Sequence, residues 1–304
     1  KERKKMKIAA VIVTYNRLDM LKEVLDAFDN QIKQPDYLIV VNNASTDNTS
    51  EFLELWSKTG SMSKIVITTS ENIGGSGGFY VGTEKAIQLG ADWIWVSDDD
   101  AIPNLDVFAK AYEHINNINW NEVSAICTEV RTNGEISLSN RSIRKNSFLK
   151  FKLIHVPAIE YENRSFECDN FSYVGVLMNK LALDKVGLIN KDYFIWRDDV
   201  EHSWRLSEWG KIVCYTDMIV DHRVNSDDYR GVSWKTYYAY RNDLLMFKNH
   251  KKRIFYYLKI IVAIMRGIFS KKRKILKLYI DAIHAAQMNE KGVNSKYQPG
   301  TKVV

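Results

Sequence analysis

Short apolar segments alternate with helical patterns over the first hundred residues, and this alternation constrains the fold more than any other feature. Between the first two segments, Leu21, Val24, Leu25 and Phe28 recur at helical spacing. Alternating strands and helices are typical of right-handed crossovers and a mostly parallel sheet. We therefore expect an α/β fold, a Rossmann-like sheet flanked by helices, with strands at Ile8–Val13, Tyr37–Val41, Lys64–Thr69 and Trp93–Val96.

The second half of the chain is more mixed, and fewer of its segments have a clear pattern. Asn133-Gly134 is typical of a hairpin turn. Gly187 is typical of a residue that closes a helix. The elements expected here are strands at Val123–Cys127 and Ser172–Met178, and helices at Leu181–Val186 and Asp199–Trp209.

Size and composition exclude several classes of protein. The chain has 304 residues, 45% of them hydrophobic, so it can bury a large core and lacks the composition of a disordered protein. Cys127, Cys168 and Cys214 form no Cys-X-X-Cys pair, which indicates free thiols in a reducing compartment. No apolar run approaches the roughly 20 residues that span a bilayer.

The positive charge is concentrated in one C-terminal segment. The net charge is +6, yet the stretch from Leu244 to Ile280 holds eleven Lys and Arg and no Asp or Glu, so the remainder is mildly acidic. Its basic residues interleave with apolar ones, which favours a helix lying on an anionic membrane surface through residues 248–280, with Tyr256 and Tyr257 at headgroup depth. Nucleic-acid binding fits less well because the apolar content is high. A helix hairpin packed on the main domain is the alternative.

The strongest local motif is the run from Trp93 to Asp100, a buried-looking strand that ends in three carboxylates, Asp98, Asp99 and Asp100. Three adjacent like charges repel one another, and a divalent cation would offset that repulsion. Oxygen ligands suit Mn²⁺ or Mg²⁺, and such ions commonly bridge substrate phosphates. The alternative is a helix N-terminus with acidic residues in its first turn.

A glycine-rich run follows the third expected strand. Gly74, Gly75, Gly77 and Gly78 would let the backbone approach a ligand closely. We expect a helix to begin near Gly78, with its N-terminus facing phosphate or sugar. A flexible loop is the alternative, and a phosphate-binding P-loop is excluded because no Gly-Lys-Ser/Thr ending follows.

A second acidic motif, Asp198-Asp199, lies among aromatic residues. Paired acids in such surroundings can have one carboxylate tuned as a general base, and Trp196 could stack on a sugar ring. The alternative is a helix N-terminus with an acidic cap and a Glu201–Arg205 pair. A lone His222 after a later strand is more often structural than a ligand. The run from Tyr237 to Asn242 either holds an anionic acceptor or packs a helix.

Taken in order, these motifs resemble the inverting family-2 glycosyltransferases of the GT-A fold. The resemblance covers roughly residues 6–245 and rests on Val13-Thr14-Tyr15-Asn16-Arg17, Asn43-Ala44-Ser45-Thr46-Asp47, Asp98-Asp99-Asp100, and Asp198-Asp199-Val200-Glu201 with Arg205. It implies a GT-A fold and transfer of a sugar from a nucleotide-sugar donor to a hydroxyl.

The resemblance also implies roles for individual residues. Asp199 is the expected base, with Asp198 beside it. Asp98 and Asp100 are the expected ligands of Mn²⁺ or Mg²⁺ on the donor diphosphate, with His222 as a further ligand. The expected acceptor-binding residues are Trp196, Glu201 and Arg205. The expected donor-binding residues are Thr14, Tyr15, Asn16, Arg17, Asn43, Asp47, Gly74, Gly75, Gly77, Gly78, Asp98 and Asp99.

Within the family, the glycine-rich run, the acidic triplet and the late His222 resemble galactofuranosyltransferases, whereas Tyr237-Tyr238 with Arg241-Asn242 also resembles rhamnosyltransferases. The expected reaction is transfer from UDP-galactofuranose to a lipid-linked bacterial cell-surface glycan, with dTDP-rhamnose as the alternative donor. Two other classes remain as alternatives, a metal-dependent nucleotidyltransferase and a non-catalytic sugar-binding module.

The resemblance and the charge pattern together predict an organisation for the chain. We expect a glycosyltransferase domain at 1–245, with a donor half at about 1–118 and an acceptor half at about 119–245, and a membrane-associating basic tail at 246–304. This predicts a cytoplasmic enzyme bound peripherally to the inner face of the cell membrane, without a nucleic-acid partner. A homo-oligomer is left open.

Overall fold

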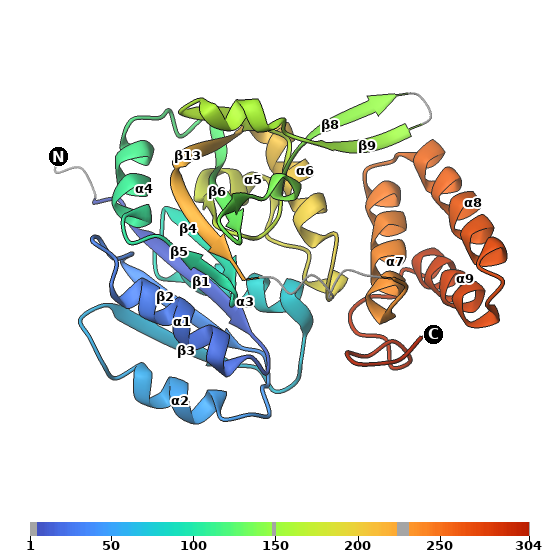
Figure 1. The fold of residues 1–304 in the computed structure, drawn as a ribbon, viewed down its shortest axis with the longest axis horizontal. Helices are drawn as coiled ribbons and strands as arrows, with labels where there is room; N and C mark the ends of the chain where they lie inside the picture. Colours follow the sequence, from blue (N-terminus) through green and yellow to red (C-terminus); the bar gives the residue numbers. More distant parts are fainter. Residues whose placement is uncertain (1–4, 148–149, 224–230, 304) are drawn as a thin grey trace.

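The computed structural model describes residues 5–147, 150–223 and 231–303. One mixed sheet runs through the first two thirds of the chain, with the strand order β10-β13-β6-β12-β4-β1-β2-β3 (Figure 1). Short strands β5 (Ala101–Pro103) and β7 (Glu135–Ile136) pair with β13 and β6. The main strands are β1 (Ile8–Thr14), β2 (Tyr37–Asn42), β3 (Ser63–Thr68), β4 (Trp93–Asp98), β6 (Val123–Thr132), β10 (Ser165–Cys168), β12 (Val176–Asn179) and β13 (Lys211–His222).

Helices cover both faces of this sheet, as expected for an α/β fold. Side chains alternate along β4, so Trp93 and Trp95 pack on one face while Ile94 and Val96 pack on the other. The first face is covered by α1 (Leu18–Asp29), α2 (Thr49–Trp56) and α4 (Val107–Asn116). The second is covered by α3 (Gly74–Gln88), α5 (Lys180–Val186) and α6 (Asp198–Trp209).

The sheet is parallel from β4 to β3 and mixed on the other side of β4. β1 pairs in parallel with both β2 and β4, and β2 pairs in parallel with β3, as the strand–helix alternation predicts. β12 then runs antiparallel to β4 and β6, and β13 runs parallel to β6. Because β1, β2 and β4 are parallel, their carboxyl ends meet at one edge of the sheet.

A smaller sheet with the order β11-β8-β9 lies beside the main one. β8 and β9 form a hairpin that extends toward the C-terminal helices (Figure 1). Short 3₁₀ turns connect the remaining segments. The bounds are β8 (Arg141–Ser147), β9 (Lys150–His155), β11 (Asn170–Phe171), and 3₁₀ turns at Leu138–Asn140, Ala158–Glu162 and Lys191–Tyr193.

Several predicted boundaries differ from the structure, most of them by one or two residues. The strand expected at Ser172–Met178 begins only at Val176, since Gly175 has φ of +66° and interrupts it. The helix expected near Gly78 begins at Gly74, and the helix expected from Asp199 begins at Asp198. The predicted hairpin turn is confirmed, because Thr132 pairs with Glu135 across Asn133 and Gly134.

The C-terminal segment is helical, as predicted, and forms a separate body beside the sheet (Figure 1). It consists of α7 (Trp234–Asn249), α8 (Arg253–Phe269) and α9 (Arg273–Gln287). These helices share one apolar core, which also takes in Tyr193 and Phe194 from the loop before α6. The boundary predicted at residue 245 falls inside α7, and the domain division itself stays a prediction.

None of the helices in the described part of the chain combines the length and the apolar content needed to cross a bilayer.

Candidate active site

The expected site residues converge where β1, β2 and β4 end. Thr14 on β1 pairs with Asn42 on β2, and Val13 pairs with Asp98 on β4. Asp99 and Asp100 follow directly and are buried. The polar clusters that follow three separate strands therefore lie at one edge of the sheet, as the parallel order predicts.

Arg17 and Thr14 hold the acidic triplet from the side of β1. Arg17 Nη1 lies 2.9 Å from Asp99 Oδ1 and 2.9 Å from Asp100 Oδ2. Thr14 Oγ1 donates a 2.7 Å hydrogen bond to Asp99 Oδ2. Burial raises the pKa of Asp99 to about 6 even though Arg17 opposes that rise. Both residues thus order the carboxylates, and their contact with a donor stays a prediction.

His222 completes a cluster of metal-ligand type with two of these acids. β13 ends beside β5, where His222 pairs with Ala101, the residue after Asp100. One ligand atom from each of Asp98, Asp100 and His222 lies within 4.8 Å of the others. His222 Nε2 is 3.2 Å from Asp100 Oδ1. This strand pairing explains how a residue far along the chain reaches the triplet.

The charges in this cluster fit a divalent cation. Burial and the neighbouring Asp100 and Asp99 carboxylates raise the pKa of Asp98 well above its usual range. At Asp100, burial also acts to raise the pKa, but His222 and Arg17 outweigh it. Among described residues, no group donates a well-aligned hydrogen bond to the buried Asp100 Oδ1. Two carboxylates and an imidazole are a donor set that Mn²⁺ accepts, and Mg²⁺ accepts the oxygens.

The glycine-rich run forms the first turns of α3 rather than a loop. Gly74 has φ of +76°, and a Cβ there would lie 2.0 Å from the Phe194 carbonyl oxygen. A Cβ at Gly78 would lie 2.5 Å from Val13, so this glycine lets α3 pack closely on β1. Only Gly75 faces open space, with nothing within 4 Å of its position for a Cβ. Packing thus requires glycine at 74 and 78, and contact of the run with a donor stays a prediction.

The loops after β1 and β2 are joined by their own side chains. Asn16 Oδ1 accepts a 2.7 Å hydrogen bond from the Thr46 amide. Asp47 Oδ1 accepts the Thr49 amide at 3.1 Å at the start of α2. The buried Asn43 donates to the Gly74 carbonyl oxygen at 3.0 Å and so braces the start of α3. Tyr15 is half-buried beside them. These residues shape one wall of the site, and their nucleoside contacts stay predictions.

The second acidic motif begins α6 and is preceded by a strained loop. Phe194, Trp196 and Arg197 have φ of 66°, 65° and 72°. Such conformations cost on the order of 1–3 kcal/mol each and persist only where the surroundings require them. The loop from 193 to 197 delivers Asp198 and Asp199 to the first turn of α6. Trp196 is half-buried in it.

Both carboxylates of that turn have raised pKa values. Burial, followed by the neighbouring Asp199 charge, raises the pKa of Asp198 to about 7. Burial also raises the pKa of Asp199, although the Val200 amide and Arg197 act against it. Asp199 Oδ1 accepts a 2.7 Å hydrogen bond from that amide. Asp198 is close enough to the triplet that its charge raises the pKa of Asp98. The two acidic motifs therefore belong to one site.

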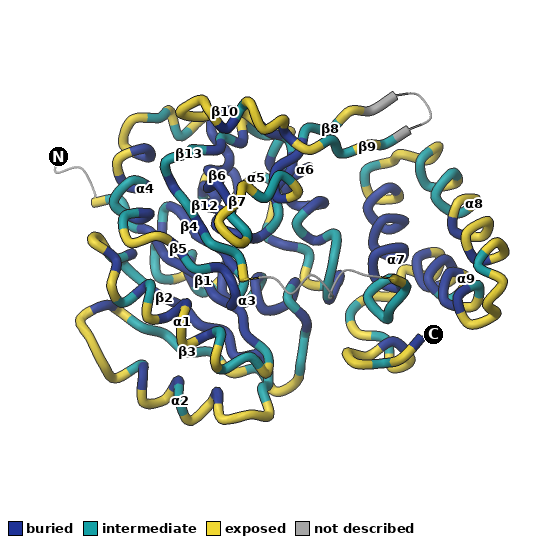
Figure 2. The backbone as a smooth tube through the Cα atoms, in the orientation of Figure 1, coloured by how far each residue is buried: buried dark blue, intermediate teal, exposed yellow. Residues whose placement is uncertain are grey.

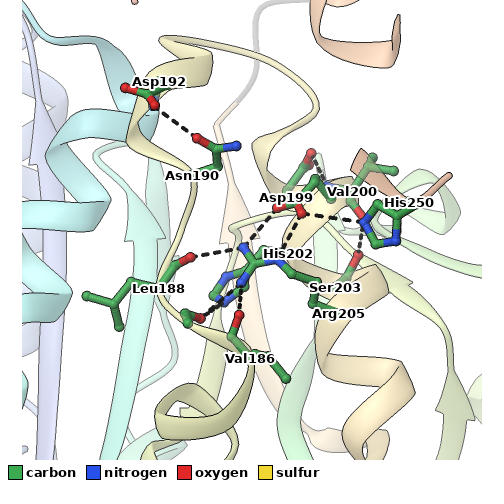
Figure 3. A network of polar contacts seen from close by, with 12 residues as sticks. Val186, Leu188, Asn190, Asp192, Asp199, Val200, His202, Ser203, Arg205 and His250 are labelled. Atoms are coloured by element: carbon green, nitrogen blue, oxygen red, sulfur yellow. Dashed lines mark hydrogen bonds and ion pairs between the residues drawn. The ribbon is translucent and has the colours of Figure 1, made fainter. Parts of the chain in front are cut away.

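Arg205 is engaged within the protein, where its side chain contacts the backbone of Val186 and Leu188 (Figure 3). Arg205 Nη2 lies 2.8 Å from Glu201 Oε2, the pair expected as the alternative to acceptor binding. Arg205 also donates to the carbonyl oxygens of Val186, Gly187 and Leu188. Their predicted role in acceptor binding stays untested.

Several residues of this region have no signal in the sequence. His250 Nε2 lies 3.5 Å from Glu201 Oε1, and its ring stacks on Trp204. Burial lowers the pKa of His202 to about 3. Its Nε2 faces the Gly187 carbonyl oxygen and its Nδ1 faces the Tyr173 hydroxyl, which assigns a neutral ring that donates from Nε2. Only the tertiary fold brings these groups together.

A cleft of about 580 Å³ lies elsewhere, at the other edge of the sheet. It is lined by Glu122, Glu167, Ser207 and Lys211, among others, and includes none of the expected site residues.

Comparison with known proteins identifies the sequence family. The family model described as "Glycosyl transferase family 2" matches residues 9–173. Over 97 residues the chain is 43% identical to galactofuranosyltransferase GlfT1 of Mycolicibacterium smegmatis, and this match covers 32% of this chain and 30% of that protein. Over 160 residues it is 28% identical to abequosyltransferase RfbV of Salmonella typhimurium, which covers 47% of each. The matches thus span less than half of these relatives.

Solved structures share the fold along nearly the whole chain. TarS of S. aureus in complex with UDP has a TM-score of 0.57 at 16% identity, covering 94% of this chain and 88% of that one. GalNAc-T7 with UDP, GalNAc and Mn²⁺ has a TM-score of 0.64 at 13% identity, covering 93% and 56%. The mannosyltransferase PcManGT of Pyrobaculum calidifontis, in complex with GDP-Man and Mn²⁺, has a TM-score of 0.57 and covers 93% and 75%. The expected GT-A fold is thereby confirmed.

Proposed function

The chain belongs to glycosyl transferase family 2, and from that premise we propose that it is an inverting, metal-dependent galactofuranosyltransferase that uses UDP-galactofuranose. One observation carries the proposal. Asp98, Asp100 and His222 form a cation-type cluster at the carboxyl edge of the sheet, and Asp198-Asp199 lies within electrostatic reach of it. Family membership favours sugar transfer over the nucleotidyl transfer and sugar-binding alternatives.

In the proposed reaction, Asp199 accepts a proton from the acceptor hydroxyl. The hydroxyl oxygen attacks the anomeric carbon, a new C–O bond forms on one face, and the bond to UDP breaks on the other. UDP leaves with the electron pair, so the configuration inverts. Burial raises the pKa of Asp199, which makes this carboxylate a stronger base than an exposed one. A positioned base contributes about 10²–10⁴-fold to the rate.

The Asp98, Asp100 and His222 side chains would hold Mn²⁺ or Mg²⁺, which supplies a Lewis acid against the charge of the diphosphate. Arg17 holds Asp99 and Asp100 in place for this role. The open position at Gly75 leaves room for a donor beside the start of α3. The expected nucleoside contacts from Tyr15, Asn16, Asn43 and Asp47 belong to the same proposal.

Galactofuranose is proposed as the sugar because of the 43% identity with galactofuranosyltransferase GlfT1. The abequosyltransferase match leaves a donor with another sugar as the alternative, and dTDP-rhamnose is the alternative donor in the test. Release of nucleotide from UDP-galactofuranose, UDP-galactopyranose, UDP-glucose and dTDP-rhamnose, each with and without chelator, separates these donors. Chelator-sensitive release of UDP from the furanose donor supports the proposal, and release from the rhamnose donor alone replaces the sugar.

We further propose that α8 lies on an anionic membrane surface at the inner face of the cell membrane, where a lipid-linked glycan acceptor would be found. Much of the outer side of α8 is exposed (Figure 2). Exposed apolar side chains recur there at helical spacing, among them Tyr257, Ile261, Ile268 and Phe269. Exposed basic residues flank the helix at 251–253 and 271–274. An apolar stripe between two basic ends suits the interface of an anionic bilayer.

A further inference from the structure

The strained loop before α6 needs outside support, and α7 supplies it. Asn242 Nδ2 lies 3.0 Å from the Tyr193 and Ile195 carbonyl oxygens and 2.8 Å from that of Trp196. Arg241 Nη2 donates to the Tyr193 carbonyl oxygen at 3.0 Å. These contacts hold the backbone of residues 193–196. They leave the orientation of the next residue, Arg197, to other groups.

Asp243, the next residue of α7, is the group that contacts Arg197. Asp243 Oδ1 lies 2.9 Å from Arg197 Nε. Its second oxygen, Oδ2, lies 2.5 Å from Lys259 Nζ on α8. The Asp243 side chain is only 7% exposed, so its charge requires close cationic partners. One buried carboxylate therefore ties the loop before α6 to two helices of the C-terminal body.

Arg197 is the residue immediately before α6. It caps the helix in the left-handed conformation, and Asp198 and Asp199 follow it directly. A residue in this conformation sets the direction in which the first turn leaves the loop. Any rotation of Arg197 would move the two carboxylates relative to Asp98 and Asp100.

We propose that Asp243 is a positioning residue for catalysis, which holds Arg197 and thereby the first turn of α6 with Asp199. The proposal rests on the proposed function, in which Asp199 is the base. Asp243 touches no reacting atom in this account. Its loss should therefore lower turnover without weakening the binding of the donor. The cation-type cluster of Asp98, Asp100 and His222, where the donor diphosphate would bind, belongs to other elements.

The test uses the full chain with Asp243→Asn, Arg197→Gln and the double variant. Asp281→Asn is the matched control, since Asp281 also pairs with a lysine in the same helical body but lies on α9, away from the loop. The expected result is a kcat about 10- to 100-fold lower in both single variants, with donor affinity unchanged within about twofold. The kcat of the double variant should be no lower than that of the more impaired single variant, because both substitutions break the same Arg197–Asp243 contact.

Hydrogen exchange provides a readout that does not depend on turnover. Amides of residues 193–201 should exchange about tenfold faster in Asp243→Asn than in the wild type, and Asp281→Asn should leave them unchanged. If Asp243→Asn fails to fold, Arg197→Gln must show both effects by itself, because Arg197 is partly exposed and tolerates replacement.

The outcomes separate the two proposals. Wild-type kcat in Arg197→Gln, multiplied effects in the double variant, or unchanged exchange of the 193–201 amides would overturn the role of Asp243. A wild-type protein that transfers no sugar would instead overturn the proposed function, and the exchange measurement would still decide whether Asp243 holds the loop.

Discussion

His222 Nε2 lies 3.2 Å from Asp100 Oδ1 because the end of β13 pairs with β5, the short strand that follows Asp100. The pairing brings a residue from the late part of the chain to carboxylates at the end of β4 and directly after it. It also places the imidazole beside the Asp98 and Asp100 carboxylates, so that the three side chains could hold one cation.

Replacement of His222 by alanine should raise the Mn²⁺ concentration needed for half-maximal activity by at least about tenfold, because even indirect partners of a metal contribute 10- to 100-fold to its affinity. Titration of activity with Mn²⁺ measures this effect. His284→Ala is the control, since that histidine is exposed on α9. A His222→Ala titration that coincides with the wild type would remove His222 from the cation site.

Some residues of this site can be placed from the sequence and others cannot, for physical reasons. Thr14, Asn43 and Asp98 follow strands whose parallel order is visible in the pattern of apolar segments, so their convergence is predictable. His222 could be brought to them only by the antiparallel β13–β5 pairing, which has no local signal.

The glycine-rich run and the second acidic motif show what local sequence patterns leave out. The glycine-rich run predicts a close approach of the backbone to a ligand, yet the contacts of Gly74 with Phe194 and of Gly78 with Val13 are packing contacts of a helix. Trp196 and Arg197 have left-handed conformations and contact Asn242 and Asp243 of α7, and no pattern within the loop predicts these contacts.

The role of Gly74 in packing predicts a contrast between two neighbouring glycines. Gly74→Ala should lower the free energy of unfolding by about 2–4 kcal/mol, because φ is positive and the new methyl group meets the Phe194 carbonyl oxygen. Gly75→Ala should change it by less than about 1 kcal/mol, since nothing lies within 4 Å. Urea denaturation measures both. Equal stability of the two variants would contradict the packing account.

Stability should fall in acid because of two buried groups on α6. Burial lowers the pKa of His202 to about 3 from 6.5, and the pKa of Glu201 is about 2 because His250 and Arg205 outweigh its burial. The unfolded chain therefore binds more protons than the folded protein below pH 6.5 at His202 and below pH 4.5 at Glu201. Stability from both groups is complete above these values and is lost as the pH falls toward the folded pKa values.

Urea unfolding at pH 7.5 and pH 5.5 tests the contribution of His202. Protonation of His202 in the unfolded chain should lower the free energy of unfolding of the wild type by about 1 kcal/mol between these two pH values. His202→Gln should lose this part of the pH dependence, whereas His284→Gln should retain it. A His202→Gln variant with undiminished pH dependence would exclude His202 as the cause.

The outer face of α8 predicts binding to anionic vesicles. Deleting the C-terminal helices would expose the core they share with Tyr193 and Phe194, so surface substitutions are the better test. Serine at Ile261, Ile268 and Phe269 should weaken binding to phosphatidylglycerol vesicles about 100-fold or more, because each side chain loses its apolar contact with lipid. Vesicle sedimentation measures the partition constant.

The matched control for the membrane prediction replaces exposed apolar residues on the opposite part of the molecule. Serine at Ile32, Leu55 and Leu105 removes comparable apolar surface near α1, α2 and α4. These substitutions should leave vesicle binding unchanged, and binding of the wild type should fall as the salt concentration rises. Equal loss in both triple variants would show that α8 is no specific membrane surface.

The turnover of Asp199→Asn tests the central claim most directly, because this substitution removes the proposed base and nearly preserves its shape. Sugar transfer with Mn²⁺ should fall about 10²–10⁴-fold, while calorimetry should give the donor affinity of the wild type. Asp184→Asn, a change in an exposed acid on α5, should retain full activity. Transfer by Asp199→Asn at the wild-type rate would contradict the assignment of Asp199 as the base.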